Sequence, residues 1–214
     1  MLLLAFDTAT PAVTVALHDG DKIVAAESAV DARRQGELLT PFIDRALAGA
    51  GAGRGDLTAI AVGTGPGPYT GLRAGLVTAR VLGSALGIPV DGWCTLDIIA
   101  AAVAAPGGEF LVATDARRKE LYWARYSAAG ERTGGPAVCP ATDLEPGLPV
   151  AGEGAVLYPD LGAEPIAPRY PDAACLAALS AKRILAGTSP SPAEPLYLRR
   201  PDAREPGQRK RVTP

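Results

Sequence analysis

The sequence predicts an α/β fold of two similar lobes, each with a mixed sheet that starts with a hairpin and is covered by helices. Two observations carry this prediction. Short apolar runs alternate with longer stretches of helical periodicity, and the stretch that begins at Leu2 is echoed by one that begins at Phe110. With 214 residues, 48% of them apolar, the chain is long enough to bury a sizeable core.

Three strands are predicted at the start of the first lobe. Leu2 to Phe6 is a continuous apolar run, which is typical of a buried strand. The turn DTATP separates it from a second strand, Val13 to Leu17. Asp19-Gly20 is a favourable hairpin centre, so a third strand is expected at Ile23 to Ala26.

Helices and strands then alternate. Glu37 to Ala48 carries apolar residues at helical spacing, and Pro41 indicates either a kink or the true start of that helix. Leu57 to Val62 is predicted as a buried strand, and a helix from about Gly71 to Leu86 follows a glycine-rich loop. GIPV is expected to form a short strand, and Leu96 to Ala105 a further helix.

The second half of the chain contains an apparent copy of the start. LLLAFDTATPAVTVALHDG and FLVATDARRKELYWARYSA align without a gap and pair Ala5 with Ala113, Asp7 with Asp115, Val13 with Leu121, Val15 with Trp123 and Ala16 with Ala124. Two unrelated hairpins could match this well by chance. If the repeat is real, the chain divides into lobes at residues 1–106 and 107–200, followed by a flexible basic tail at 201–214.

Composition excludes several classes of protein. The net charge of −2 means that the chain has no overall positive potential to attract nucleic acid. Three cysteines without CxxC spacing argue against a disulfide framework or a zinc site. His18 is the only histidine, expected to be exposed at a hairpin end, so neither a metal site nor a Ser-His-Asp triad is expected. The N-terminus lacks the pattern of a signal peptide and no apolar run approaches a membrane span, so we expect a soluble, cytoplasmic protein without a cofactor.

The duplicated design resembles the actin-like ATPase (ASKHA) superfold, whose lobes each begin with a hairpin that points an acidic turn at a central cleft. That superfold binds ATP phosphates with glycine-rich turns, because glycine lets backbone amides approach closely. Here the first turn, DTAT, has Ala9 where a glycine would help, and the second, DARRKE, has no glycine. We interpret Asp7, Thr8, Thr10 and Asp115 as relics of a degraded nucleotide site. The alternative for the two aspartates, which we favour, is that they cap their own turns.

The glycine-rich loop GTGPGPYTGLRAGL has three possible interpretations. A phosphate-binding loop is disfavoured, because no Gly-Lys-Ser/Thr ending follows and Pro66 and Pro68 lack N–H donors. A tight strand-to-helix turn is the second, with Tyr69 or Thr70 near the N-cap. The third is a family motif, made of Gly65, Pro66, Gly67, Tyr69, Thr70, Gly71, Leu72 and Arg73.

The run AIAVGTGPGPYTGLRAGLVTARVLGSALGIPVDG is similar to the hallmark segment of the TsaB (YeaZ) family. LLAFDTAT, ELLTPFID, VATDARRKELYWARY and PLYLR extend the resemblance over roughly residues 2–200. The catalytic relative, TsaD, carries a His-x-x-x-His metal pair whose positions fall on Thr95 and Ile99 here, so the resemblance implies that this metal chemistry is absent. Gln35 stands where typical family members have a histidine.

The resemblance implies a non-catalytic scaffold that pairs with TsaD and activates it. TsaD transfers threonylcarbamoyl to the adenosine next to the anticodon of tRNA, and a small ATPase, TsaE, joins the pair. The chain is expected to touch tRNA only indirectly and to form a homodimer when alone. The expected partner-binding residues lie on two helices of the first lobe: Leu38, Leu39, Phe42, Leu72, Gly75, Leu76 and Ala79.

A different class of function also has to be considered, namely an active enzyme of the same superfold. An ATP-dependent kinase would need glycines in the DTAT and DARRKE turns, together with a catalytic aspartate over the cleft. A metallopeptidase would need the missing imidazoles. Both are alternatives to the scaffold hypothesis.

Overall fold

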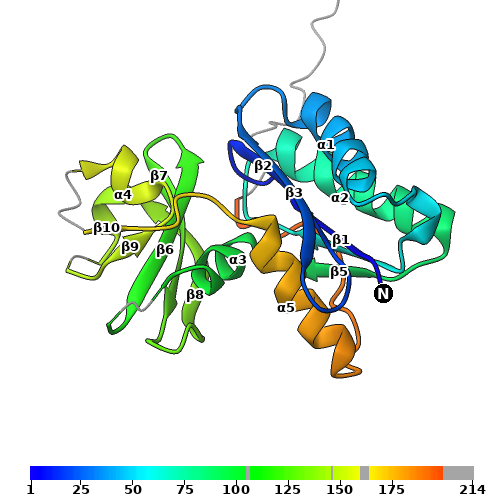
Figure 1. The fold of residues 1–214 in the computed structure, drawn as a ribbon. Coiled ribbons are helices and arrows are strands. Elements are labelled where there is room, and N and C mark those ends of the chain that lie inside the picture. The colour runs from blue at the N-terminus through cyan, green and yellow to red at the C-terminus, as the bar shows by residue number, and fades with distance from the viewer. Residues whose placement is uncertain (105–106, 146, 160–163, 200–214) are drawn as a thin grey trace, which may run out of the picture.

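A computed structural model describes residues 1–104, 107–145, 147–159 and 164–199 of the chain (Figure 1). It contains two five-stranded sheets, one in each lobe, with helices packed on their faces. The two lobes lie side by side, with the first on the right of Figure 1 and the second on the left. The expected two-lobed, actin-like α/β fold is confirmed.

The first sheet has the strand order β3-β2-β1-β4-β5. Its strands are β1 (Leu3–Asp7), β2 (Ala12–His18), β3 (Ile23–Val30), β4 (Ala59–Gly63) and β5 (Val90–Trp93). β1, β2 and β3 form an antiparallel meander, whereas β4 and β5 run parallel to β1. Every residue of β1, β2 and β4 is buried, as the continuous apolar runs predicted, because helices cover both faces of the sheet.

Two helices cover one face of the first sheet. They are α1 (Gln35–Gly49), which begins before Pro41 and continues through it, and α2 (Tyr69–Leu86). A short 3₁₀ turn, Arg54–Asp56, leads from α1 to β4. The core under these helices is formed by alternate strand residues and the inward faces of both helices, including Leu4, Phe6, Val15, Ile60, Val62, Leu39, Phe42 and Leu72.

The second sheet repeats the arrangement of the first. Its strands are β6 (Phe110–Arg117), β7 (Glu120–Tyr126), β8 (Arg132–Pro140), β9 (Val150–Ala151) and β10 (Pro165–Ile166), in the order β10-β9-β6-β7-β8. Antiparallel β6, β7 and β8 correspond to β1, β2 and β3, and parallel β9 and β10 correspond to β4 and β5. The predicted duplication is therefore real at the level of topology.

The strand pairing of the two hairpins differs by one residue, because β6 has an irregularity between Asp115 and Arg117 that β1 lacks. Ala5 pairs with Ala16 in the first hairpin, but Ala113, the counterpart of Ala5, pairs with Trp123 and not with Ala124. The second turn is tighter, since Arg117 already pairs with Glu120. By strand pairing, Trp123 is thus the counterpart of Ala16, whereas the sequence alignment matched Ala16 with Ala124.

Two of the three remaining helices pack on a sheet from the other side of the boundary predicted at residue 106. α3 (Thr95–Ala101) lies before the boundary in sequence, yet Leu96, Ile99 and Ala100 pack on the second sheet with Phe110 and Tyr126. α4 (Gly154–Leu157) and the 3₁₀ turn Ala141–Asp143 cover the opposite face of that sheet. The helix predicted over 96–105 ends at Ala101.

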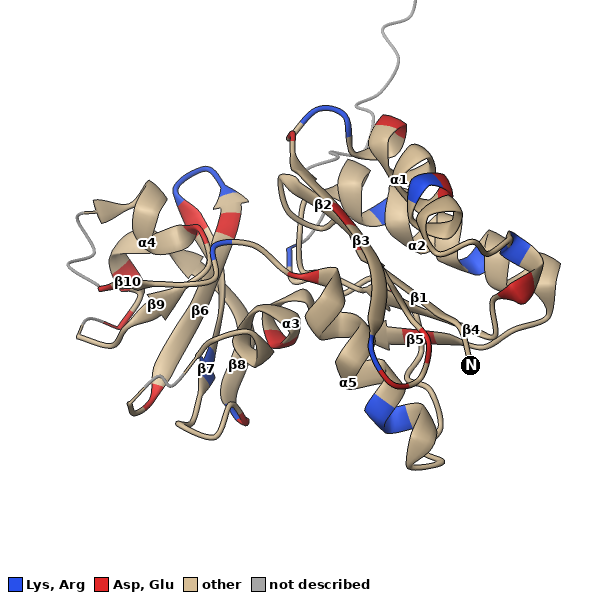
Figure 2. Cartoon of the chain, in the orientation of Figure 1, with Lys and Arg blue, Asp and Glu red and all other residues tan. Residues whose placement is uncertain are grey.

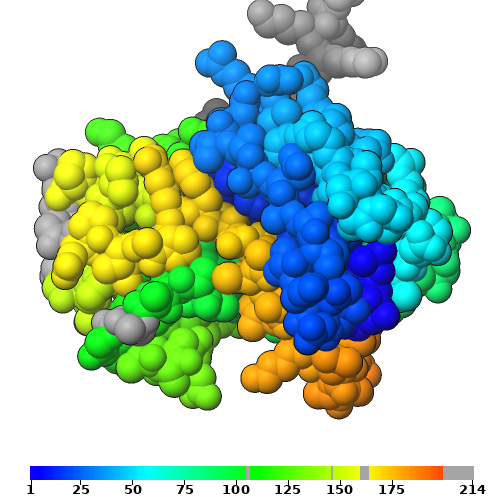
Figure 3. Space-filling view, viewed as in Figure 1, coloured from blue at the N-terminus to red at the C-terminus, as the bar shows by residue number. Residues whose placement is uncertain are grey.

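The last helix, α5 (Ala173–Leu185), returns to the first lobe. Its apolar stripe of Ala173, Leu176, Ala177 and Ala181 packs on the face of the first sheet opposite α1 and α2, against Leu3, Ala5 and Ala16. In Figure 3 the orange atoms of α5 lie directly against the blue atoms of the first lobe. The unit predicted at 107–200 therefore supplies a helix to the first lobe, because the second face of the first sheet would otherwise be exposed.

No helix within the described ranges is long and apolar enough to cross a bilayer. The basic tail predicted at 201–214 lies outside the described residues.

We predict that α5 contributes to the stability of the first lobe. Leu176→Ala removes a fully buried side chain and should lower the free energy of unfolding by about 2–5 kcal/mol. Leu185→Ala, on the same helix but 68% exposed, should change it by less than about 0.5 kcal/mol. Urea denaturation followed by circular dichroism measures both. Equal effects of the two variants would contradict the packing of α5 on the sheet.

Candidate functional site

The turn after β1 is organised by a buried carboxylate. Asp7 ends the strand and has no exposed surface. Its Oδ1 accepts the N–H of Ala9 at 2.7 Å, and its Oδ2 accepts the hydroxyl of Thr95 at 2.7 Å. Burial raises the pKa of Asp7 from 3.8 to about 6, because desolvation disfavours the charged form more than these two hydrogen bonds favour it.

Thr95 connects this turn to the glycine-rich loop. Its hydroxyl accepts the N–H of Gly65 at 3.1 Å, and its own N–H donates to the carbonyl of Gly65 at 2.7 Å. Ile99, one helical turn further along α3, is fully buried in the core between that helix and the second sheet. Thr95 therefore has a structural role, and we call this group the Asp7–Thr95–Gly65 network.

The glycines of the loop allow close packing against the first turn. A Cβ at Gly63 would lie 1.8 Å from the Asp7 carboxylate, one at Gly67 2.0 Å from the Ala9 carbonyl oxygen, one at Gly71 2.3 Å from the Thr8 carbonyl oxygen and one at Gly75 2.5 Å from the Thr8 hydroxyl. These four positions are spaced by four residues in the sequence. The spacing arises because the loop and the start of α2 lie directly on residues 7–9.

The other polar residues of the first turn are also satisfied within the chain. The Thr8 hydroxyl donates to the carbonyl of Gly71 at 2.7 Å, and the Thr10 hydroxyl accepts the N–H of Ala12 at 3.2 Å. Gln35, at the family's histidine position, is buried and donates to the carbonyl of Thr10 at 3.4 Å. The turn is thus held by hydrogen bonds to its own backbone, to the start of α1 and to the start of α2.

The second turn has a similar aspartate but a different backbone. Asp115 accepts the N–H of Arg117 at 2.8 Å, as Asp7 does from Ala9, so both aspartates cap their turns as predicted. Arg117, Arg118 and Lys119 all have φ near +60°, a left-handed conformation that non-glycine residues adopt rarely. Figure 2 shows the turn between β6 and β7 in blue at one end of the second sheet.

The space between the two turns is small. A cavity of about 10 Å³ remains there, lined among others by Thr10, Pro68, Thr114 and Glu153, and this volume is the size of a single water. Burial raises the pKa of Glu153. A more open cavity of about 310 Å³, lined by Tyr69, Tyr122 and three arginines among others, lies beside it at the mouth. The smaller of these two cavities, which adjoins Thr10 and Thr114, has no room for a phosphate group.

The remaining residues of the loop motif lie at the start of α2. Pro68 is the N-cap residue, no side chain caps the helix, and Tyr69 and Thr70 follow as its first two residues, near the N-cap as predicted. Leu72 is buried in the core. The guanidinium of Arg73 donates to the hydroxyl of Tyr197 at 3.0 Å, a partner from the C-terminal end of the described chain that local sequence did not indicate.

Most of the predicted partner-binding residues face the interior of the first lobe. Leu39, Phe42, Leu72, Gly75, Leu76 and Ala79 are all buried within the single chain, and Leu38 is half-buried. Helical periodicity identifies an apolar stripe, but here the first sheet already covers that stripe. The exposed side of these two helices therefore carries other residues than the predicted ones.

The outward side of α1 and α2 carries its own apolar residues. Val77 is 59% exposed and Val81 60% exposed, one helical turn apart on α2. They line an open groove of about 330 Å³ together with Thr40, Ile43, Arg54, Thr78 and Leu82. We call this surface the α1–α2 face. It lies on the side of the first lobe away from the second lobe (Figure 1).

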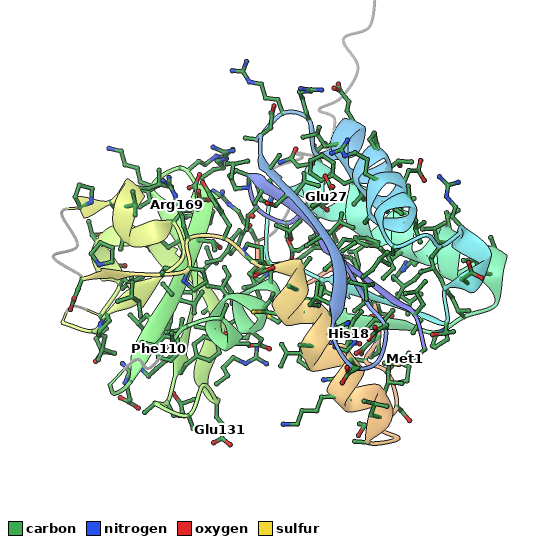
Figure 4. The ribbon with its side chains drawn as sticks, in the orientation of Figure 1. Met1, His18, Glu27, Phe110, Glu131 and Arg169 are labelled. Carbon is green, nitrogen blue, oxygen red and sulfur yellow. The ribbon has the colours of Figure 1, made fainter. Side chains whose placement is uncertain are left out.

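The remaining candidate for metal or acid–base chemistry is remote from these turns. His18 is buried, contrary to the prediction of an exposed side chain; its Nδ1 accepts the N–H of Gly20 at 2.9 Å. It lies beside Met1, at the opposite end of β2 from the first turn (Figure 4). Among the described residues, no group of three or more His, Cys, Asp or Glu side chains could hold a metal ion.

Comparisons with known proteins agree on one family. A family model described as TsaD, tRNA N6-adenosine threonylcarbamoyltransferase, matches residues 27–159. An uncharacterized protein of Mycobacterium tuberculosis is 49% identical over 205 residues, which are 94% of this chain and 93% of that protein. The solved structure of YeaZ from Pseudomonas aeruginosa is 31% identical, with a TM-score of 0.75 over 92% of this chain and 99% of its own. The Escherichia coli tRNA threonylcarbamoyladenosine biosynthesis protein TsaB is 32% identical over 128 residues, 59% of this chain and 55% of that protein.

Burial of Asp7 predicts a pH-dependent stability. Its pKa is higher in the folded state, about 6, than the ordinary 3.8, so the folded protein retains a proton that the unfolded chain releases. The stability of the natural protein relative to Asp7→Asn should therefore fall as the pH rises from 3 to 7, by about 3 kcal/mol, and then level off. Urea denaturation of both proteins at each pH measures the difference. A difference that is constant over this range would contradict the burial of a titrating carboxylate.

Close packing of the loop predicts opposite effects at two helical glycines. Gly71→Ala, in the first turn of α2, should lower the free energy of unfolding by about 1–3 kcal/mol because its methyl group would collide with the Thr8 carbonyl. Gly36→Ala, in the first turn of α1, has no atom within 4 Å of the new methyl group and should be neutral or stabilising by up to about 1 kcal/mol. Thermal unfolding compares the pair. Stabilisation by both changes would show that the turn does not need this glycine.

Proposed function

Because this chain belongs to the TsaD family and is TsaB (YeaZ)-like within it, we propose that it is a non-catalytic subunit that docks on TsaD and stabilises its active conformation. TsaD would then transfer threonylcarbamoyl to the adenosine next to the anticodon of tRNA. The observation that carries the proposal is the α1–α2 face, which places an exposed pair of valines on a rigid helix that no other part of the described chain covers.

The α1–α2 face has the chemistry of a helix-docking surface. Val77 and Val81 stand one turn apart on the outward side of α2, and Thr40 of α1 and Arg54 line the opposite wall of the groove. A helix from a partner can bury both valines by lying along the groove, as ridges pack into grooves between helices. The sequence likeness between this chain and the TsaD family makes the equivalent helices of TsaD the partner that we propose.

The non-catalytic role is supported by the contacts of the turns after β1 and β6. The groups that would bind a phosphate or a metal are engaged in the Asp7–Thr95–Gly65 network, and a volume of about 10 Å³ remains between the turns. A kinase would need room for a nucleotide phosphate at this point, and a metallopeptidase would need imidazole ligands in place of Thr95 and Ile99.

Further partners follow from the same family assignment. We propose that a TsaE ATPase joins the pair, that tRNA contacts this subunit indirectly, and that the complex works in the cytoplasm. In the absence of TsaD, the α1–α2 face of one copy would meet the same face of a second copy, which gives a symmetric homodimer.

The test is co-purification of this chain with the TsaD of the same organism. Val77→Glu and Val81→Glu should each abolish the association, because a carboxylate buried in an apolar interface costs several kcal/mol. Val30→Glu is the matched control, since Val30 is also 60% exposed but lies at the end of β3, outside the α1–α2 face.

All three variants should melt within a few degrees of the natural protein, because each replaces an exposed side chain. Threonylcarbamoylation of tRNA by purified TsaD should fall with the first two variants and persist with Val30→Glu. Association that survives both Val77→Glu and Val81→Glu would refute docking through this face.

A further inference from the structure

The end of the described chain runs back across the first lobe. After α5, residues 188–199 form an extended segment that first follows β5. Gly92 donates its N–H to the carbonyl of Ser191 at 2.9 Å, and Ser191 donates its own N–H to the buried carboxylate of Asp91 at 2.8 Å. The contact is close, since a Cβ at Gly92 would lie 2.3 Å from the carbonyl oxygen of Pro192.

Two arginines of α2 hold the middle of this segment. Arg80 donates from Nε and from Nη2 to the carbonyl of Ala193, at 3.0 and 2.7 Å. Arg73 donates to the hydroxyl of Tyr197 at 3.0 Å, and the rings of Tyr197 and Tyr69 lie 4.9 Å apart. The segment is therefore fastened to α2 through Arg73 and Arg80.

The segment then reaches the glycine-rich loop and crosses to the second lobe. Leu196 donates its N–H to the carbonyl of Thr64 at 2.8 Å. Arg199 lies against the second lobe, where it donates to the carbonyl of Ala116 at 3.1 Å and pairs with Glu120 at 3.1 Å. These two partners flank the left-handed turn at residues 117–119.

We propose that residues 188–199 are a strap that fixes the orientation of the second lobe relative to α2. The strap is bound to β5, α2 and the glycine-rich loop of the first lobe. The half-buried Arg199 at its end binds the residues that flank the second-lobe turn. Arginine suits this role because its planar fork can bond a carbonyl and a carboxylate at the same time.

The strap has a consequence for the way the molecule can move. The lobes of this fold are joined by α3, by the chain between β10 and α5, and by the strap, and a cavity of one water's size lies between their turns. With the strap in place, the basic turn at 117–119 keeps a fixed position relative to α2. This inference concerns the isolated chain and does not require that TsaD is the partner.

Hydrogen–deuterium exchange of the full chain tests the strap. Arg199→Ala should raise the exchange rates of amides in two places, the strap around Leu196 and the hairpin around residues 116–120, by on the order of tenfold. Arg80→Ala releases the strap from α2 and should raise exchange at the same two places. The radius of gyration from small-angle X-ray scattering should increase in both variants.

Arg125→Ala is the matched control. The side chain of Arg125 is 28% exposed, against 23% for Arg199, and its acidic partners Glu109 and Glu145 both belong to the second lobe. It should leave exchange in the strap unchanged. Two outcomes would overturn the proposal: an Arg199→Ala profile that matches the Arg125→Ala profile, or an increase spread evenly over both lobes, which would mean that Arg199 acts on global stability.

Discussion

The hydrogen-bonded burial of Asp7 is the constraint on which the rest of this molecule depends. A carboxyl group without exposed surface is tolerated only if its oxygens have donors, and here the donors come from its own turn and from Thr95 at the start of α3. Thr95 in turn holds Gly65 by two bonds. The end of β1, the glycine-rich loop and the helix that leads into the second lobe therefore meet at one buried point. Substitution of Asp7, Thr95 or Gly65 would therefore disturb the contact region between the two lobes.

The glycines around this point explain why the loop resembles a phosphate-binding loop. In both cases glycine is needed because something must approach the backbone closely. In a nucleotide site that object is a phosphate, whereas here it is the turn at residues 7–9, which lies where an added Cβ on Gly67 or Gly71 would be. The same local pattern thus serves packing within the chain, and only the identity of the neighbouring atoms separates the two uses.

Local features of the fold could be predicted from the sequence, and the assignment of helices to sheets could not. The capping role of Asp7 and Asp115 follows from their own neighbours, as do the strands on which they lie. The crossing of α3 and α5 between lobes does not follow, because an apolar stripe such as that of Leu176 fits either sheet equally well by pattern. The same limit explains Leu39 and Leu76: periodicity shows which side of a helix is apolar, but not whether the sheet or a partner covers it. Gly71 and Gly75 are more informative, since two glycines one helical turn apart indicate a close contact on one side of α2, and both approach Thr8.

The different roles of α2 come from different sides of one helix. Its glycine side lies on the first turn, its leucine side fills the core, its valine side is open at the α1–α2 face, and Arg73 and Arg80 fasten the C-terminal segment. A helix fixed on three sides cannot tilt or rotate to suit whatever binds on the fourth. Binding at Val77 and Val81 would therefore cost little conformational entropy in this chain, and the partner would have to adapt. That asymmetry is what a subunit needs if it is to impose a conformation on another protein, and it arises from packing that the single chain already contains.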